Sequence, residues 1–290
     1  MKFIDLFSGI GGFRMAMEAA GHECVGFCEI DKYAVQSYRA IYDTEGEFYA
    51  EDITRVDPGE FPDFDCLTGG FPCQSFSIAG KRGGFDDTRG TLFFDIARIA
   101  EARRPDVLLL ENVKGLLSHD GGGTFRTILR TLDELGYDLE WQVLNSKDFG
   151  VPQNRERVFI VGHLRGQSRR PVFPLGGTGQ TADCQQVSDG TGISHAIDAN
   201  YHKGLGPSQI GRGKRTQIIQ TVKMDSKGTH VTTSHRIRRL TPRECWRLQG
   251  FPDWAFDKAK QAGLSDMQLY KQAGNSVTVN VVYEIAKRLT

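Results

Sequence analysis

Short apolar runs alternate with amphipathic stretches along the first 165 residues. The apolar runs are rich in strand-forming residues and predict strands at residues 2–7, 24–29, 65–68, 106–111, 140–144 and 158–161. Apolar residues at helical spacing predict helices at residues 13–20, from about 32, at 91–103 and at 124–135. Strands that alternate with helices are typical of βαβ units with right-handed crossovers. This part of the chain therefore predicts an α/β fold built on a mainly parallel sheet.

The pattern changes after residue 165. Between 166 and about 213, Gly, Ser, Thr, Gln and Pro dominate, which predicts loops and short strands of a second, irregular module. Residues 241–249 read as a helix, with Thr241 as N-cap, Pro242 in the first turn and Glu244 three residues after the cap. A terminal helix is expected over residues 277–289, after a Gly-Asn-Ser turn at 274–276.

Length and cysteine usage limit the class of protein. The 290 residues leave room for one large domain and a smaller one. No apolar run reaches about 18 residues, so no membrane span is expected. The start of the chain lacks a signal-peptide pattern, so a cytoplasmic location is expected. The six cysteines have no Cys-x-x-Cys spacing, which disfavours a four-cysteine zinc site and predicts reduced, mostly buried thiols.

A net charge of zero hides a charge asymmetry. Residues 1–65 contain fourteen acids and five Lys or Arg, whereas residues 202–247 contain eleven Lys or Arg and two acids. A basic segment of this kind can neutralise the phosphates of a nucleic acid. An ordinary solvated surface has the same charges, and charge alone does not separate the two interpretations.

The first chemical motif is the glycine-rich stretch from Asp5 to Phe13. A strand there runs into a turn and then a helix, which lets a ligand approach the backbone closely. Glu29 ends the next strand, twenty residues after Gly9, where an acid can accept both ribose hydroxyls of a nucleoside. The motif fits a dinucleotide as well as adenosylmethionine. The full G-x-G-x-x-G pattern is not met, because Arg14 stands in place of the third glycine.

Two further motifs and an arginine pair carry side chains that can act on a substrate. Cys73 lies after a predicted strand in Gly-Gly-Phe-Pro-Cys-Gln-Ser, the setting of an exposed, fixed thiol. Glu111 ends an apolar strand at the carboxyl edge of the sheet, where a carboxyl pKa can rise. Arg155 and Arg157 share a strand face and can hold a phosphate or a base edge. Taken singly, these residues also fit a structural cysteine, a solvated strand end and surface ion pairs.

In their order and spacing, these motifs resemble the cytosine-C5 DNA methyltransferase family. The resemblance rests on the glycine-rich opening, the Phe-Pro-Cys-Gln loop, Glu-Asn-Val at 111–113 and Gln-x-Arg-x-Arg at 153–157. It continues in Arg-Leu-Thr-Pro-Arg-Glu-Cys at 239–245 and Gly-Asn-Ser-Val at 274–277. It covers residues 2–161 and 239 to the end, and skips the stretch between. Each motif alone is modest, but six in this order are highly specific.

The resemblance implies the Rossmann-like fold of adenosylmethionine-dependent methyltransferases. The catalytic domain would comprise residues 1–165, completed by 265–290, with a target-recognition domain inserted at 166–264. Within that insertion, residues 166–236 would read the target, and residues 75–90 would form a mobile loop that closes over DNA. By motif position, the contacts to S-adenosylmethionine are expected from Phe7, Ile10, Gly12, Glu29, Ile30, Asp52, Ile53, Pro72, Leu92, Asn275, Ser276 and Val277. Glu29 would hold the ribose and Asp52 the adenine amino group.

The chemistry that the resemblance implies needs no metal. The Cys73 thiolate would add to C6 of cytosine and so make C5 nucleophilic enough to take a methyl group. Glu111 would assist at N3 as a proton donor, and Arg155 and Arg157 would hold the base oxygen and neighbouring backbone. Because these atoms are out of reach in a stacked duplex, the cytosine must be flipped out.

The implied partner is double-stranded DNA with a short target, bound by a monomer. Candidates for phosphate contacts are His202, Lys203, Arg212, Lys214 and Arg215, with Thr221 and Val222 as a backbone-supporting pair. No nuclease motif is present, so a cognate restriction enzyme, if there is one, would be a separate chain.

Three rival functions remain. An NAD-linked dehydrogenase would use the glycine-rich turn and Glu29, but it leaves the Pro-Cys loop unexplained. An RNA cytosine-C5 methyltransferase of the transfer-RNA type is disfavoured because the Cys-Phe-Thr tripeptide of that group is absent. A catalytically dead DNA-binding relative is disfavoured because Cys73, Glu111 and both arginines are present. Amino-methylating DNA enzymes use a Pro-Pro loop, and the chain has no Pro-Pro.

Overall fold

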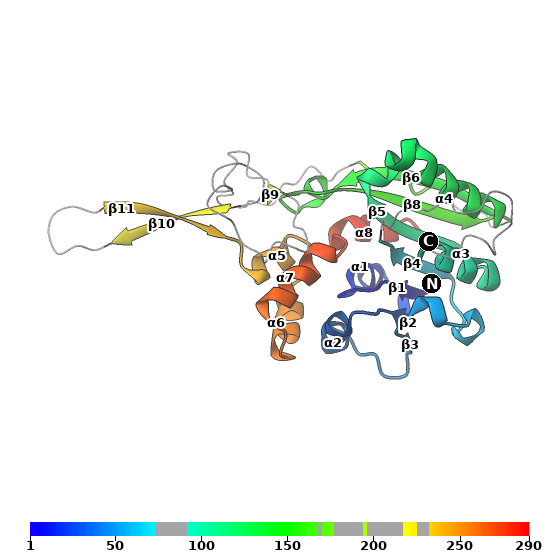
Figure 1. The fold of residues 1–290 in the computed structure, drawn as a ribbon, viewed down its shortest axis with the longest axis horizontal. Helices are drawn as coiled ribbons and strands as arrows, with labels where there is room; N and C mark the ends of the chain where they lie inside the picture. The colour runs from blue at the N-terminus through cyan, green and yellow to red at the C-terminus, as the bar shows by residue number, and fades with distance from the viewer. Residues whose placement is uncertain (73–91, 167–169, 177–193, 196–216, 225–231, 290) are drawn as a thin grey trace.

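A single twisted sheet forms the centre of the molecule (Figure 1). The computed structural model describes residues 1–72, 92–166, 170–176, 194–195, 217–224 and 232–289. Seven strands lie in the order β3-β2-β1-β4-β5-β8-β6. Their bounds are β1 Lys2–Leu6, β2 Glu23–Cys28, β3 Phe48–Ala50, β4 Cys66–Gly70, β5 Val107–Val113, β6 Tyr137–Asn145 and β8 Glu156–Leu164.

Six of the seven strands run in one direction, and five of them are paired with one another in parallel. β3, β2, β1, β4 and β5 run in one direction, and β8 runs antiparallel to both β5 and β6. The prediction of a mainly parallel sheet is confirmed, and the departure is confined to one edge. β6 and β8 are joined by a short connection that permits only an antiparallel pair, since a parallel neighbour needs a long crossover. The carboxyl ends of the parallel strands therefore meet along one edge, where such sheets bind ligands.

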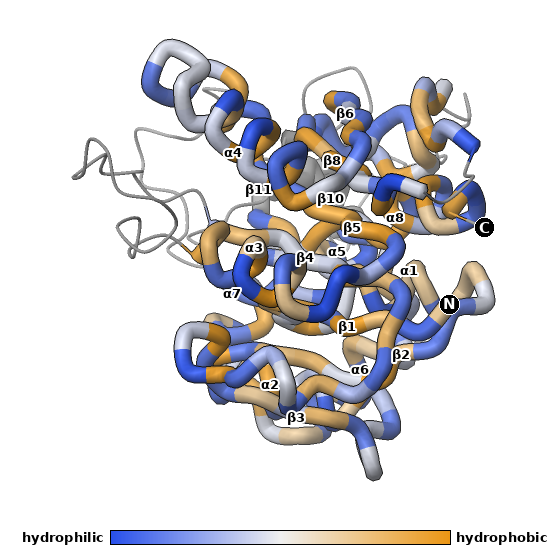
Figure 2. The backbone as a smooth tube through the Cα atoms, turned by 90° about the vertical axis from the view of Figure 1, so that its right-hand side faces the viewer, coloured by the Kyte–Doolittle hydropathy of each residue, from blue (hydrophilic) through white to orange (hydrophobic). Residues whose placement is uncertain are grey.

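Side chains alternate between two buried clusters, one on each face of the sheet. In β5, Val107 and Leu109 belong to one cluster, and Leu108 and Leu110 to the other. This period of two is the geometry of a strand, and a strand buried on both faces reads as a continuous apolar run. Figure 2 shows β5 as such a hydrophobic stretch in the interior.

Helices cover both faces of the sheet. Residues of α3 and α4 complete one cluster, and residues of α1, α2 and α5 to α8 complete the other. The bounds are α1 Gly12–Ala19, α2 Lys32–Ile41, α3 Leu92–Arg103, α4 Gly123–Glu134, α5 Pro242–Arg247, α6 Asp253–Gln261, α7 Asp266–Asn275 and α8 Val279–Ala286. The end of the chain thus returns to its beginning: α8 packs on α1, and His22 Nε2 lies 3.2 Å from the carbonyl oxygen of Ala286.

The C-terminal helices differ in part from the prediction. The capping box of Thr241 and Glu244 is present, as predicted for α5. A second capping box, of Ser265 and Gln268, starts α7, and this helix runs through Asn275, where the sequence predicted a turn. The terminal helix accordingly begins at Val279 and not at 277. Neither α6 nor α7 was predicted.

Two smaller sheets lie outside the central one. β10 (Gln217–Met224) and β11 (Thr232–Arg239) form an antiparallel pair that extends away from the body beyond α5 (Figure 1). β7 (Gln153–Asn154) pairs in parallel with β9 (Ser194–His195). The predicted insertion at 166–264 contains β9, β10 and β11, while β7 precedes it, and the limits of the insertion stay a prediction. α6 lies near the end of this predicted insertion and packs against α2, where Lys258 Nζ donates to the carbonyl oxygen of Ile41 at 3.1 Å.

Some predictions fall outside the described residues. These are the nucleophile Cys73, the loop at 75–90 and the phosphate-contact candidates His202, Lys203, Arg212, Lys214 and Arg215. For Thr221 and Val222 only the backbone is described, within β10. Across the part of the chain that is described, no helix is long and apolar enough to cross a membrane.

Candidate active site

The glycine-rich turn between β1 and α1 approaches the C-terminal part of the chain very closely. Gly11 precedes α1 with a φ of 78°, in the left-handed region that favours glycine. At Gly12, a Cβ atom would lie 2.7 Å from Val277 Cγ1 and 2.8 Å from Ser276 Oγ. A side chain at residue 12 would therefore push the two segments apart. Residues from opposite ends of the sequence meet here, as the predicted cofactor site requires.

Glu29 is fixed beside this turn by two backbone amides. Its Oε2 accepts from the amide of Gly9 at 2.8 Å, and its Oε1 accepts from the amide of Asp31 at 2.7 Å. Burial raises the pKa of Glu29, and the two amides act in the opposite direction. Each carboxylate oxygen keeps further acceptor capacity. The next residue, Ile30, is 66% exposed, so an apolar surface lies next to the carboxylate.

The acid that follows β3 is also held in place. Asp52 Oδ1 accepts from the amide of Thr54 at 3.0 Å and from its hydroxyl at 2.7 Å, and these hydrogen bonds lower the pKa of Asp52. Arg98 of α3 donates to the carbonyl oxygen of Ile53 at 2.8 Å, which ties this segment to the helix that begins at Leu92. Hydrogen bonds thus connect the segment after β1 to Glu29 after β2, and the segment after β3 to the middle of α3.

The predicted cofactor residues differ in exposure. Exposed are Ile30, Pro72 and Asn275; partly buried are Phe7, Glu29, Asp52 and Leu92; buried are Ile10, Gly12, Ile53, Ser276 and Val277. The side chains of Ile10 and Ile53 belong to the two core clusters, so each can offer a ligand its backbone more readily than its side chain.

Glu111 and Arg157 form an ion pair across β5 and β8. Arg157 Nε lies 3.0 Å from Glu111 Oε1, and both side chains are largely buried. In the register, Glu111 is paired with Gly70 of β4. A Cβ at Gly70 would lie 3.2 Å from Glu111 Oε2, so glycine at this position leaves the carboxyl group room. Gly70 is the third residue before Cys73.

Opposed effects set the protonation of Glu111. Burial raises its pKa, while the charges of Arg157 and then Arg155 lower it, and the net direction is upward. A carboxyl group that is easier to protonate than usual, yet hydrogen-bonded to a cation, can donate or share a proton.

The two arginines, which were predicted to share a strand face, have different partners, and Arg155 lies just before β8. Arg155 is only 3% exposed, and its Nη2 donates to the carbonyl oxygens of Gly274 at 3.1 Å and Ser276 at 2.8 Å. Burial and the charge of Arg157 lower the pKa of Arg155. Arg155 therefore links the strand of Arg157 to the segment that packs on the glycine-rich turn, while Arg157 alone pairs with Glu111.

One positioning residue was missed by the sequence analysis. Asn112 is 2% exposed, and its Nδ2 donates to the carbonyl oxygen of Phe71 at 2.8 Å, two residues before Cys73. The sequence contains a signal for this role, because the polar Asn112 stands in a strand whose residues before Glu111 are all apolar. A buried amide in such a strand needs a partner. Here it fixes the backbone that leads to Cys73.

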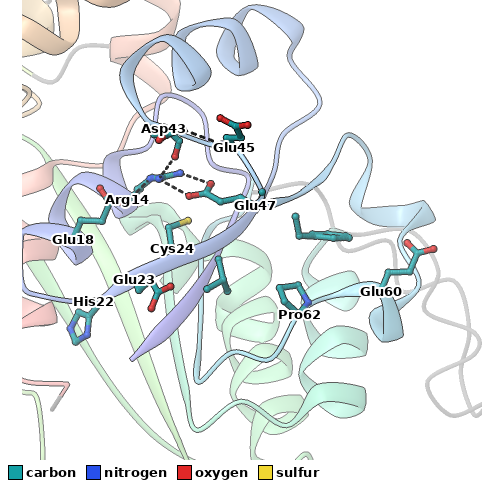
Figure 3. A pocket seen from close by; sticks show the side chains of 13 residues that line it. Arg14, Glu18, His22, Glu23, Cys24, Asp43, Glu45, Glu47, Glu60 and Pro62 are labelled. Atoms are coloured by element: carbon teal, nitrogen blue, oxygen red, sulfur yellow. Dashed lines mark hydrogen bonds and ion pairs between the residues drawn. The ribbon is translucent and has the colours of Figure 1, made fainter.

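A cavity of about 940 Å³ lies elsewhere, beside Arg14 (Figure 3). Arg14 bridges Glu18 at 2.7 Å and Glu47 at 2.7 Å, and it donates to the carbonyl oxygen of Asp43. None of the predicted site residues lines this cavity. Arg14, which breaks the dinucleotide pattern, thus serves to hold the 43–47 segment onto α1.

Comparisons with known proteins identify the family of the chain. The family model described as C-5 cytosine-specific DNA methylase matches residues 1–176 and 176–290. The Type II methyltransferase M.NlaX of Neisseria lactamica is 41% identical over 306 residues, which cover 99% of this chain and 96% of that protein. The Type II methyltransferase M.HhaI of Haemophilus parahaemolyticus is 37% identical, with 99% and 93% covered. The S. pombe Dnmt2 methyltransferase, at 21% identity, shares the fold with a TM-score of 0.70 over 99% of this chain and 97% of that one. The chain therefore belongs to the C-5 cytosine-specific DNA methylase family and is a DNA (cytosine-5-)-methyltransferase.

Proposed function

We propose that this enzyme transfers a methyl group from S-adenosylmethionine to C5 of a cytosine flipped out of duplex DNA, with Cys73 as the nucleophile. The observation that carries the proposal is the buried Glu111–Arg157 pair beside Gly70. Cys73 follows Gly70 by three residues, so chain length alone keeps their Cα atoms within about 11 Å. A thiol and a carboxyl of raised pKa are then available to one base.

The residues at the edge of the sheet fit S-adenosylmethionine. Glu29 offers acceptors for two ribose hydroxyls, Ile30 an apolar face for the adenine, and Asp52 an acceptor for its amino group. The hydroxyl of Ser8, in the same turn, is buried without a hydrogen-bond partner among the described residues, and a polar ligand at the turn would supply one. When bound, the cofactor supplies an electrophilic methyl group.

The protein side of the reaction begins at Cys73. Its thiolate forms a bond to C6 of the cytosine while Glu111 gives or shares a proton at N3, so that electron density gathers at C5. After C5 has been methylated, the C5 proton leaves, the bond between Cys73 and C6 breaks, and the proton at N3 returns to Glu111. Water is our candidate for the base that takes the C5 proton.

Arg157 has a double role in this scheme. It holds the carboxyl of Glu111 in place through Nε, and another of its nitrogens, Nη1, donates to the carbonyl oxygen of Glu156 at 2.8 Å. The guanidinium group has five N–H donors in a rigid plane, so one edge can still meet the base oxygen. Arg155, by contrast, supports the backbone of Gly274 and Ser276.

We further propose that residues 166–264 recognise a short DNA target and that the enzyme acts as a monomer in the cytoplasm. The basic stretch at 202–247 would supply phosphate contacts. Relatives such as M.NlaX are named Type II methyltransferases. A restriction enzyme that cuts the same target would be a separate chain.

The test is methyl transfer to plasmid DNA from S-adenosylmethionine with a labelled methyl group, followed by nucleoside analysis. We expect label in 5-methyldeoxycytidine, none with Cys73→Ser, and full transfer with the matched control Cys184→Ser. Calorimetry should show binding of S-adenosylmethionine and not of NAD. Label in an exocyclic amino group, or in RNA in preference to DNA, would refute the proposal.

A further inference from the structure

A short segment after β8 is bound to the sheet edge by side chains and not by a strand ladder. Residues 171–175, here called the exit segment, have the sequence Pro-Val-Phe-Pro-Leu, so only three of the five carry an amide N–H. The amides of Val172 and Phe173 donate to Glu140 at 2.8 and 2.9 Å, and that of Leu175 donates to Gln142 at 2.8 Å. Every amide of the exit segment is therefore taken up by a side chain of β6.

The carbonyl groups of the exit segment are held in the same way. Gln142 Nε2 donates to the carbonyl oxygen of Leu175 at 3.1 Å. Arg288, just beyond α8, donates from Nη1 to the carbonyl oxygens of Val172 at 2.9 Å and Pro174 at 3.0 Å. Two elements distant in sequence, β6 and the C-terminal end of the chain, thus grip one short segment through its backbone.

The orientation of Glu140 is itself fixed. His163 of β8 lies with its Nε2 2.9 Å from Glu140 Oε1, the oxygen that also accepts from Val172. Both side chains are largely buried. Hydrogen bonds to a charged acceptor are about twice as strong as neutral ones. The contacts of Glu140 are therefore the firmest part of this attachment.

The exit segment lies where the chain leaves the catalytic domain. It lies near the start of residues 166–264, which we assign to target recognition, and most of that stretch follows residue 176. Where the chain returns, the hydroxyl of Tyr270 donates to the carbonyl oxygen of Leu240 at 2.6 Å, and Arg239 lies over the Tyr270 ring at 5.2 Å. Residues 171–175 and 239–240, which flank the larger part of the recognition stretch, are thus attached to the catalytic framework by specific contacts.

We infer that Glu140, Gln142 and Arg288 are positioning residues for DNA recognition: they hold the exit segment so that the recognition domain meets DNA in register with the active site. The inference rests on the proposed role of residues 166–264. When only a fraction of molecules has the binding-competent arrangement, the apparent Kd rises by the inverse of that fraction. A looser exit segment lowers the fraction without altering the catalytic groups.

A purely structural role makes a different prediction. Prolines and side-chain contacts also shield an edge strand such as β6 from pairing with another chain. If shielding were their only role, weakening these contacts would lower stability or promote aggregation, and DNA affinity per folded molecule would stay constant. Separate measurements of DNA affinity, cofactor affinity and turnover distinguish the two roles, because only the recognition role predicts a selective loss of DNA affinity.

The experiment uses the full-length enzyme with Gln142→Leu and Arg288→Met, singly and together. Lys287→Met is the matched control, since Lys287 adjoins Arg288 but pairs with Glu284 at 2.8 Å. Hydrogen exchange at Val172 and Leu175 reports release of the exit segment. The probes are a short duplex with the target found by bisulfite sequencing, and a duplex of equal length without it.

We expect faster exchange in the double variant and, for a competent fraction of about one tenth, roughly tenfold weaker binding of the target duplex. Turnover at saturating DNA and the affinity for S-adenosylmethionine should stay within about twofold, and Arg288→Lys should restore DNA binding. Faster exchange with unchanged DNA affinity overturns the inference, as does unchanged exchange in every variant. If the double variant does not fold, the single variants decide in the same way. A wild-type enzyme that methylates no DNA cytosine refutes the proposed function instead.

Discussion

The buried carboxyl group of Asp5 allows a quantitative test of the fold beneath the glycine-rich turn. Asp5 is completely buried in β1; the Tyr38 hydroxyl donates to its Oδ2 at 3.3 Å, and the Thr68 hydroxyl donates to its Oδ1 at 3.3 Å. Burial raises the pKa of Asp5 from 3.8 to about 8, and the charge of Arg14 lowers the pKa only in part. The perturbation is Asp5→Asn, which has the same shape and does not titrate.

The magnitude follows from proton linkage. Between pH 4 and 8 the folded protein keeps a proton on Asp5 that the unfolded chain releases. A group whose pKa is raised in the folded protein stabilises the fold at low pH. As the pH rises, this contribution to the free energy of unfolding falls by about 1.4 kcal/mol per pH unit. From pH 3.8, which equals the ordinary pKa of the carboxyl group, to pH 7, the free energy of unfolding of the wild-type protein therefore falls by about 4 kcal/mol through Asp5.

The asparagine variant avoids this loss while keeping both contacts. The Thr68 hydroxyl can donate to the carbonyl oxygen of Ile4, 3.2 Å away, and accept from the new amide, and Tyr38 can donate to the amide oxygen. The two proteins should therefore be similar in stability near pH 4, and Asp5→Asn should be the more stable at pH 7. Other titrating groups are shared and cancel in the difference.

The assay is urea unfolding at a series of pH values, followed by the fluorescence of tryptophans that include the fully buried Trp246. We expect the difference in free energy of unfolding to grow with pH up to about 8, where Asp5 ionises in the fold. A difference that stays constant from pH 4 to pH 8 would refute the reasoning. It would mean that Asp5 is ionised in the folded protein and stabilised by Arg14.

Three further predictions concern the site. Glu111→Gln should lower turnover by roughly 10² to 10⁴ without changing cofactor affinity in calorimetry, and turnover within about threefold of wild type would remove it from the mechanism. Gly12→Ala should lower stability by about 1–3 kcal/mol, because the alanine Cβ would lie 2.7 Å from Val277 Cγ1, and it should also weaken cofactor binding. An unchanged melting temperature and an unchanged Kd for S-adenosylmethionine would contradict this. Replacing Lys214 and Arg215 by Ala should lower the slope of log Kd against log salt by about two, and an unchanged slope would mean that they face solvent.

Much of the α/β framework could be predicted because its strands are apolar on both faces. β1 is apolar apart from Lys2 and Asp5, β5 begins with the apolar run 107–110, and the capping box of Thr241 and Glu244 marks the start of α5. α6 was missed because its buried side is small, and α7 because its buried residues include Gln272 and Gly274, which interrupt an apolar helical period. In α6 only Ala255, Phe256 and Ala259 are buried, which is too few for a clear helical period.

A candidate active site could be proposed from the sequence as a set of residues, but the contacts among these residues could not be predicted. The Glu111–Arg157 pair depends on the register of β5 and β8, which motif spacing does not reveal. Arg155 finds its partners 119 and 121 residues away, at Gly274 and Ser276, so no local pattern could show that it differs from Arg157. Side chains two apart share a face, but tertiary packing decides what each one meets.

The central claim, covalent catalysis by Cys73, is tested most directly by a duplex that carries 5-fluorocytosine at the target. If Cys73 adds to C6 before methyl transfer, the fluorine at C5 cannot leave as a cation, so enzyme and DNA should stay joined after methylation. We predict an adduct that requires S-adenosylmethionine, survives denaturing electrophoresis, is absent with Cys73→Ser and is present with Cys184→Ser. An adduct that persists in Cys73→Ser, or no adduct on DNA that is separately shown to be methylated, would contradict the account.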